Sequence, residues 1–299
     1  MHIVMGATGH VGSAVVRRLV DRGEEVLAIT HSRQSFSKIE AMGAKPILAD
    51  VADTAKLATV FAQGDSLFVL NPPGDVSGDA VGIERRNVAS ILEALRGSSI
   101  RKIVAESTQG AQKGEGIGDL GVLYELEEGL KAWGGDCRIT RAAYYMSNWD
   151  MQIEQVKESG RLTSFFPADF KLAMVCPIDL GNFNADQMSK PFSGFEVVDV
   201  SGPEDYTPAD VARELGRFLD LHVAVEVISR EEWPAAFKKL GFSETSAESY
   251  AAMTAITLDR AYEVPSNPVR GPTSLHAHFE SILDEDAGNL ATEQPEVIV

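Results

Sequence analysis

The sequence predicts an α/β protein built on a doubly wound parallel sheet, with a smaller C-terminal α+β lobe. Short apolar runs alternate with helical patterns through the first half of the chain. Three glycines, Gly6, Gly9 and Gly12, follow the first apolar run at steps of three residues. The alternation loses its regularity after about Trp149. Strict alternation of strands and helices requires right-handed crossovers, and these produce a parallel sheet with helices on both faces.

The first half contains six expected strands, each a short apolar run. They are 2–5, 25–30, 45–50, 66–71, 101–107 and 137–143. The segment after Gly12 has an apolar stripe at helical spacing, formed by Val15, Val16, Leu19 and Val20. Further helices are expected at 35–43, 53–64, 78–99 and 123–135. Asp53 marks the start of its helix, because Asp is a preferred N-cap residue.

The second half is expected to form the lobe, with some segments returning to the main sheet. Segment 170–188 has a short apolar run and then a helix, and 195–219 has a strand, a turn and a helix that begins near Thr207-Pro208. A strand is expected at 222–229, and helices at 230–242 and 246–264. The predicted division is therefore a core over 1–150, a lobe over 151–284 and an acidic, disordered tail over 285–299.

The composition excludes several functional classes. Lys and Arg total 27 and Asp and Glu total 44, so the formal net charge is −17. Direct nucleic-acid binding is not expected, because phosphate contacts need clustered Lys and Arg. The chain shows neither a membrane-spanning apolar run nor a signal-peptide pattern. Two distant cysteines, Cys137 and Cys176, fit structural thiols in a reducing compartment, so we expect a cytoplasmic protein.

The glycine spacing predicts a dinucleotide-binding turn between the first strand and the first helix. Gly6 makes the tight turn, Gly9 leaves room for the ligand, and Gly12 allows the helix to pack closely on the strand. The helix N-terminus then offers N–H groups and the positive end of its dipole to the pyrophosphate. A tight turn without a phosphate is the alternative, but the strand–turn–helix context favours a Rossmann-type site.

The end of the second strand bears on which dinucleotide is bound. An NAD-preferring site usually has Asp or Glu there, which binds the 2′-hydroxyl of the adenosine ribose. This strand instead runs into His31, Ser32 and Arg33, which are suited to a 2′-phosphate. We therefore expect NADP as the cofactor, with NADPH preferred over NADH. The alternative is that Arg33 is a solvated loop residue.

Further cofactor contacts are expected where other strands end, because ligands of open α/β sheets bind at the carboxyl ends of the strands. Asp50 and Val51 would border the adenine, and the segment from Asn71 would pass the second ribose. The expected cofactor-binding residues are Gly6, Ala7, Thr8, Gly9, His10, Val11, Gly12, His31, Ser32, Arg33, Asp50, Val51, Asn71, Pro72, Pro73, Ser107 and Thr108. No metal is expected: His276 and His278 offer at most two ligands, and a surface position is the simpler interpretation.

The chain resembles NmrA-like proteins, which are atypical short-chain dehydrogenases/reductases, over about residues 1–264. The matching segments are 6–12, 47–53, 66–73, 102–108, 139–149, 177–188 and 200–216. The most specific residues are Arg141, Tyr144, Tyr145 and Asn148, together with the Asp179-Leu-Gly segment. The resemblance implies a Rossmann fold with a small C-terminal lobe, and NAD(P) binding. It also implies either reduction of quinones and azo compounds or a catalytically silent, NADP-sensing role. Many members have Arg where this chain has His31.

The acid–base pair usual in short-chain dehydrogenases is incomplete. These enzymes normally use a Ser, and a Tyr four residues before a Lys that lowers the pKa of the phenol. Ser107 matches the serine, and Tyr124 lies in the corresponding helix, but Glu128 occupies the lysine position. A carboxylate raises the pKa of a neighbouring phenol, so Tyr124 is a poor acid–base group. Glu127 and Glu128 are expected on a solvated helix face.

Hydride transfer does not depend on that pair. A quinone or azo acceptor is electron-poor and takes its protons from water, so the protein has mainly to hold nicotinamide and acceptor in contact. The candidate catalytic residues are Ser107, Tyr144 and Asn148. Tyr144, with Tyr145 and Trp149 beside it, would stack on a flat acceptor, and Asn148 would hold a carbonyl. The alternative is that these aromatic residues pack the lobe against the core.

The sequence thus predicts an NAD(P)H-dependent oxidoreductase that transfers hydride to a small conjugated acceptor. The rival hypothesis is a catalytically silent NAD(P)-sensing regulator that acts through a protein partner, and the missing Tyr-x-x-x-Lys pair favours it. A homodimer is compatible with both.

Overall fold

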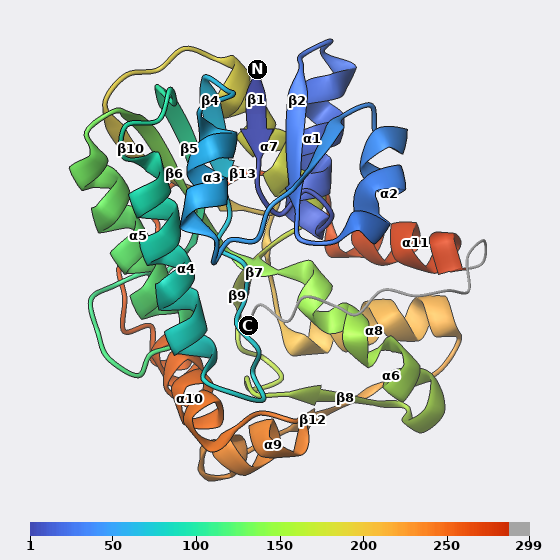
Figure 1. The fold of residues 1–299 in the computed structure, drawn as a ribbon. Helices are drawn as coiled ribbons and strands as arrows, with labels where there is room; N and C mark the ends of the chain where they lie inside the picture. Colours follow the sequence, from blue (N-terminus) through green and yellow to red (C-terminus); the bar gives the residue numbers. More distant parts are fainter. Residues whose placement is uncertain (287–299) are drawn as a thin grey trace.

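The computed structural model describes residues 1–286 and confirms the predicted fold class (Figure 1). The main sheet has eight strands in the order β13-β10-β6-β5-β4-β1-β2-β3. All neighbouring strands are parallel. The strands are β1 (His2–Val4), β2 (Val26–Thr30), β3 (Lys45–Leu48), β4 (Ser66–Val69), β5 (Lys102–Thr108), β6 (Asp136–Ala142), β10 (Phe195–Ser201) and β13 (Val269–Arg270).

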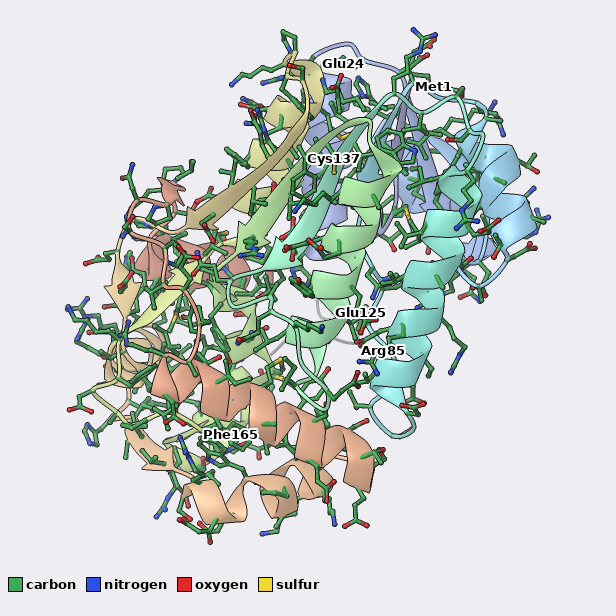
Figure 2. All side chains as sticks on the ribbon, turned by 90° about the vertical axis from the view of Figure 1, so that its left-hand side faces the viewer. Met1, Glu24, Arg85, Glu125, Cys137 and Phe165 are labelled. Carbon is green, nitrogen blue, oxygen red and sulfur yellow. The ribbon has the colours of Figure 1, made fainter. Side chains whose placement is uncertain are left out.

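Helices cover both faces of this sheet. One face packs on α3 (Thr54–Phe61), α4 (Ala80–Leu95) and α5 (Asp119–Trp133). The other packs on α1 (His10–Asp21), α2 (Phe36–Ala41) and α7 (Pro177–Ser189). The strand order reverses between β1 and β4: β2 and β3 follow on one side of β1, and β4, β5 and β6 follow on the other. Open α/β sheets bind ligands at such a switch point. In Figure 2, Arg85 of α4 and Glu125 of α5 face one another, and their side chains are 3.0 Å apart.

The α7 helix belongs to the sheet layer although it lies late in the chain. A Cβ atom at Gly181 would stand 2.5 Å from both the Ala14 Cβ and the Val11 carbonyl oxygen of α1. Only glycine therefore allows the two helices to pack this closely. Asp179 of the same helix accepts hydrogen bonds from the backbone N–H and the hydroxyl of Thr273, both at 2.8 Å. The Asp179-Leu-Gly segment thus fastens the chain after β13 to the core.

The lobe lies below the main sheet in Figure 1 and contains two small sheets. One has the order β11 (Asp205–Tyr206), β9 (Leu172–Val175), β7 (Tyr144–Tyr145), and the other pairs β12 (Ala224–Val227) with β8 (Arg161–Ser164). Its helices are α6 (Ile153–Ser159), α8 (Pro208–Leu219), α9 (Trp233–Lys239), α10 (Glu244–Asp259) and α11 (Leu275–Asp286). Short 3₁₀ turns occupy Arg33–Ser35, Met146–Gln152 and Arg230–Glu232.

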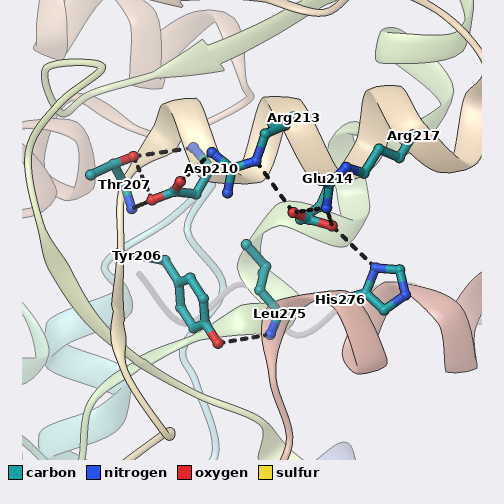
Figure 3. A network of polar contacts seen from close by, with 8 residues as sticks. All are labelled: Tyr206, Thr207, Asp210, Arg213, Glu214, Arg217, Leu275 and His276. Atoms are coloured by element: carbon teal, nitrogen blue, oxygen red, sulfur yellow. Dashed lines mark hydrogen bonds and ion pairs between the residues drawn. The ribbon is translucent and has the colours of Figure 1, made fainter.

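The last helix, α11, changes the predicted C-terminal boundary. It continues to Asp286, so the first two residues of the expected tail are helical, and 287–299 lie outside the described residues. Figure 3 shows polar contacts within α8 and those that join α8 and β11 to α11. Buried Glu214 accepts hydrogen bonds from Arg217 at 2.9 Å and His276 at 3.1 Å, and Tyr206 accepts one from the Leu275 N–H at 3.2 Å.

The surface position expected for the two C-terminal histidines is wrong for His278. His276 is exposed, but His278 is only 5% exposed. Its Nε2 lies 2.9 Å from an Asp150 carboxylate oxygen. Burial lowers the pKa of His278, but the hydrogen bonds with Asp150 and Cys176 and the charge of Asp150 outweigh burial and raise that pKa to about 9. His278 therefore joins α11 to the lobe as a buried ion pair.

The predicted thiols are confirmed as free and buried at Cys137 and Cys176. In residues 1–286, no group of three or more His, Cys, Asp or Glu side chains is arranged to hold a metal ion. No helix in this described part of the chain combines the length and apolarity that a membrane crossing requires.

Candidate functional site

The glycine turn has the geometry that its spacing predicts. Gly6 adopts a φ of +62°, and its carbonyl oxygen accepts a hydrogen bond from the Gly9 N–H at 3.1 Å. A Cβ at Gly12 would lie 2.0 Å from the same oxygen. Gly9 is the N-cap of α1 and provides no side-chain cap, so the N–H groups of the first turn are available to a phosphate. The turn therefore fits a dinucleotide pyrophosphate.

The expected adenosine contacts follow β2, the strand that pairs with β1. His31 and Arg33 are exposed, and the Ser32 hydroxyl caps the following 3₁₀ turn by accepting from the Gln34 N–H at 3.2 Å. The Arg33 guanidinium lies 5.9 Å from the ring centroid of Phe36. The segment that follows β2 thus presents Arg33 and neutral polar side chains, with no acid before Glu40.

Lys38 is a cation beside the glycine turn that sequence reasoning missed. It extends from α2, and its ammonium donates to the Thr8 carbonyl at 3.4 Å. The sequence placed Lys38 on a helix, but periodicity could not show that this face meets the first turn. On the adenine side, exposed Asp50 caps its own loop by accepting from the Ala52 N–H at 2.9 Å, and Val51 packs against the core.

A cleft at the carboxyl ends of β4, β5 and β6 gathers most of the other expected residues. Asn71, Pro73, Ser107, Thr108, Tyr144 and Asn148 all line it. Pro72 does not line this cleft, and its carbonyl accepts a hydrogen bond from Asn87 at 3.5 Å. Among residues 1–286, no group forms a hydrogen bond with the buried Asn71 Oδ1 atom. An unsatisfied buried acceptor in a cleft is the kind of group that a bound ligand satisfies.

Ser107 is held by an ion pair at the base of this cleft. Its hydroxyl donates to Glu127 at 2.5 Å, and Arg141 donates to the two oxygens of the same carboxylate at 2.9 and 2.6 Å. Glu127 is only 3% exposed, so the expected solvated position is wrong for this residue. Glu128 does face solvent and pairs with Lys131 at 3.7 Å. The burial follows from helix geometry, since Glu127 projects from α5 toward β6.

The aromatic segment after β6 divides between site and core. Tyr144 and Asn148 line the cleft and interact with one another. Burial raises the pKa of Tyr144 to about 12, so its phenol stays protonated at neutral pH. Trp149 is buried in the lobe core, and the Tyr145 hydroxyl donates to buried Glu106 at 3.1 Å. Tyr145 also lines the cleft, but its hydroxyl is bound to Glu106, and Trp149 packs in the lobe core. Stacking on an acceptor is therefore open to Tyr144.

Three acids, Glu84, Glu106 and Asp119, also line the cleft, and the sequence indicated none of them. Glu84 of α4 and Asp119 of α5 face one another there, and Glu84 accepts from the Gly74 N–H at 2.8 Å. Burial, and then the charge of Asp119, raise the pKa of Glu84 to about 9, and burial raises that of Asp119. The pair therefore holds a proton at neutral pH. No spacing signal links residues on separate helices.

Glu84→Gln is expected to weaken the dependence of stability on pH. The carboxyl has a folded-state pKa above its ordinary value of 4.5, so the folded protein binds more protons than the unfolded chain as pH rises toward 9. The free energy of unfolding of the wild type should fall over this range, and the neutral amide should remove part of that fall. Urea unfolding at about pH 6, 7, 8 and 9 measures the slope. Glu93→Gln, on the exposed face of α4, is the control. Parallel slopes for wild type and Glu84→Gln would contradict the assignment.

The cleft continues into the lobe as a second compartment, which we call the lobe chamber. It shares Thr108, Ala142 and Tyr144 with the first compartment. Its apolar wall includes Phe166, Phe170, Met253 and Tyr262, and its charged side chains are Lys171, Asp205, Arg260 and Arg270. The chamber thus begins where the candidate catalytic residues lie and extends to side chains from β9, α10 and β13.

Comparisons with known proteins agree with this geometry. A family model described as NAD(P)H-binding matches residues 6–133, which include the glycine turn, β4 and β5 but not β6. The NAD(P)H azoreductase of Xenophilus azovorans is 22% identical over 285 residues, which are 90% of this chain and 94% of that protein. Quinone oxidoreductase 2 of Escherichia coli is 22% identical over 254 residues, which are 84% and 86% of the two chains.

Solved structures share the fold over nearly the whole chain. The NADPH-dependent quinone oxidoreductase of Escherichia coli, complexed with NADPH, aligns with a TM-score of 0.80 at 20% identity and covers 95% of this chain and 100% of its own. The triphenylmethane reductase of Citrobacter sp. aligns with a TM-score of 0.79 at 18% identity and covers 95% and 99%. The chain is therefore a distant relative of NAD(P)H-dependent quinone and azo reductases, it shares its fold with a dye reductase, and its residues 6–133 match an NAD(P)H-binding family model.

Proposed function

We propose that this protein is an NADPH-dependent reductase of small conjugated acceptors such as quinones or azo compounds. The observation that carries the proposal is the connection between two compartments: the cleft at the ends of β4, β5 and β6 shares Thr108, Ala142 and Tyr144 with the lobe chamber, which has an aromatic wall. The glycine turn, at an uncapped helix N-terminus, follows β1, which pairs with β4. A site that binds the cofactor alone has no need of an aromatic chamber beyond the nicotinamide end. The relatives named as azoreductase and quinone oxidoreductase support this chemistry.

The protein's part in the reaction is mainly to position two flat molecules. When bound, NADPH supplies a hydride, so that a quinone and a proton become a hydroquinone and NADP⁺ is left. Tyr144 would pack against the acceptor ring, and the Asn148 amide would donate to its carbonyl. Ser107 has its hydroxyl committed to Glu127, so it would shape the nicotinamide pocket and hold its strand in place.

The preference for NADPH would come from the cations beside the first turn. Arg33 and Lys38 lie on the adenosine side, and the end of β2 has no acid that would repel a 2′-phosphate. Arg33→Ala should therefore raise the KM for NADPH and leave the KM for NADH nearly unchanged.

Substitutions at Tyr144 test the proposed reduction. With NADPH and 1,4-naphthoquinone, loss of the nicotinamide absorbance gives kcat and KM. Tyr144→Phe keeps the ring and should retain most of the activity, whereas Tyr144→Ala should lower kcat/KM about tenfold or more, because the positioning surface is lost. Tyr124→Phe is the matched control, since Tyr124 does not line the cleft.

The rival function predicts a different result in the same assay. Glu128 pairs with Lys131 and stands where a catalytic lysine is usual, which is the observation that favours a silent sensor. Tight NADPH binding without NADPH consumption across a panel of quinones and azo dyes would overturn the reductase proposal and support the sensor.

A further inference from the structure

The lobe chamber has a net positive charge, whereas the chain as a whole has a net negative charge. The whole chain has 44 acidic and 27 basic side chains. The chamber is lined by three cations, Lys171, Arg260 and Arg270, and by one carboxylate within the described chain, that of Asp205. Asp205 lies 3.7 Å from Arg270, and neither Lys171 nor Arg260 forms an ion pair among residues 1–286. Within the described part of the chain, two positive charges beside an apolar wall therefore have no carboxylate partner.

Arg260 has a backbone conformation that is unfavourable for a residue with a side chain. It is the C-cap of α10 and adopts a left-handed backbone with φ of 51°. Glycine is the usual residue there, because a side chain is disfavoured in that conformation. The Arg260 guanidinium lies 5.4 Å from the Phe170 ring centroid and donates to the Lys171 carbonyl at 3.2 Å. These contacts hold the guanidinium at the chamber with further N–H groups left to donate.

The aromatic wall next to these cations suits a planar ligand. Phe166 and Phe170 are stacked with ring centroids 5.5 Å apart and an interplanar angle of 10°. The rings of Tyr144 and Phe166 are arranged edge to face, with their centroids 6.1 Å apart. This contact connects the aromatic wall with the candidate catalytic residue Tyr144. A flat ring along this wall would reach from Tyr144 toward Arg260.

We propose that the preferred acceptor is a planar aromatic molecule that carries a carboxylate or sulfonate group, bound by Lys171 and Arg260 at the far end of the lobe chamber. The inference rests on the proposed reductase function and names its substrate class. The apolar wall would hold the ring, and the two cations would provide charge-assisted hydrogen bonds to the anionic group. Arg270, already paired with Asp205, would contribute less.

A matched pair of quinones tests the proposal. The wild type, Lys171→Gln, Arg260→Gly and the double variant are assayed with 1,4-naphthoquinone and with its 2-sulfonate at fixed NADPH. The double variant should raise the KM for the sulfonate tenfold or more and change the KM for the neutral quinone less than twofold. Comparing variants on each substrate removes the intrinsic difference in reactivity between the two quinones. Added NaCl should raise the wild-type KM for the sulfonate alone, because salt screens the exposed charges.

Two controls separate loss of recognition from damage to the fold. Arg260→Gly removes the backbone cost of the left-handed arginine, so its melting temperature should stay near that of the wild type. Arg96→Gln removes one positive charge, as Arg260→Gly does, but at the C-cap of α4, where the side chain is largely exposed. This variant should leave the KM for the sulfonate and the KM for the neutral quinone unchanged. Equal changes for the sulfonated and neutral quinones would overturn the proposed anion site.

A binding measurement keeps this inference distinct from the reductase proposal. Titration calorimetry of the NADP⁺-loaded protein with anthraquinone-2-sulfonate requires no turnover. Binding that weakens tenfold in the double variant supports the anion site even if no quinone is reduced. If the neutral quinone is reduced while the sulfonate binds equally to wild type and double variant, the reductase proposal stands and the anion site is wrong.

Discussion

Gly12→Ala is expected to abolish tight binding of NADPH. The new Cβ would lie 2.0 Å from the Gly6 carbonyl oxygen and 3.1 Å from the Ala7 nitrogen. Both are backbone atoms of the turn, so no side-chain rotation relieves the clash, and the turn and α1 must separate. Overpacking of this kind costs about 1–3 kcal/mol of stability. Because the same N–H groups are aimed at the pyrophosphate, the affinity for NADPH should fall at least tenfold, which calorimetric titration measures.

Gly78→Ala is the matched control for this substitution. Gly78 has an ordinary backbone conformation, and its added Cβ would meet its nearest neighbour, the Asp75 carbonyl oxygen, at 3.7 Å. Its stability should change by no more than about 0.5 kcal/mol, and its NADPH affinity should be unchanged. A Gly12→Ala variant that binds NADPH as tightly as Gly78→Ala would show that the turn does not hold the cofactor.

Arg141→Met is expected to be the most destabilising substitution of a charged residue in the cleft. Glu127, 3% exposed, would lose both hydrogen bonds from the guanidinium and keep only that from Ser107. Removing one partner of a buried pair costs about 3–5 kcal/mol, because an uncompensated charge remains in the interior. The Arg141 side chain is 24% exposed, so we expect a loss of about 3 kcal/mol, measured by urea unfolding.

A second substitution separates the buried charge from simple loss of packing. In Glu127→Gln/Arg141→Met the remaining amide is neutral, so the double variant should be more stable than Arg141→Met alone by about 1 kcal/mol or more. Arg85→Met removes the half-exposed pair with Glu125 (Figure 2) and should cost less than about 1 kcal/mol. A double variant less stable than Arg141→Met would contradict the buried-charge explanation.

Features of local physical origin could be predicted from the sequence. The glycine turn depends on residues within one strand–turn–helix unit, and its conformation follows from the need for φ above zero at Gly6. The helix starts at Asp53 and Thr207 depend on side chains that cap their own first turns, at 2.9 Å and 3.1 Å. The alternation of strands and helices determined the parallel sheet, because a crossover of this kind has only one favourable hand.

Polar residues on packed faces could not be placed in this way. Glu127 and Glu128 are adjacent and chemically alike, but only Glu127 points at the sheet, where Arg141 of β6 neutralises it. Glu84 and Asp119 meet across two helices, and the buried pair of His278 with Asp150 joins segments 128 residues apart. Periodicity shows which face of an element is apolar. It does not show which distant partner makes a buried charge tolerable.

The fold, the glycine turn and the residues that follow each strand can thus be read from the chain alone, because all of these arise from local conformational preferences. The charge of the lobe chamber depends instead on tertiary packing. Lys171, Arg260 and Arg270 come from three separate segments and converge only when β9, α10 and β13 pack around Tyr144. Their positions relative to one another are properties of that packing, and no spacing in the chain encodes them.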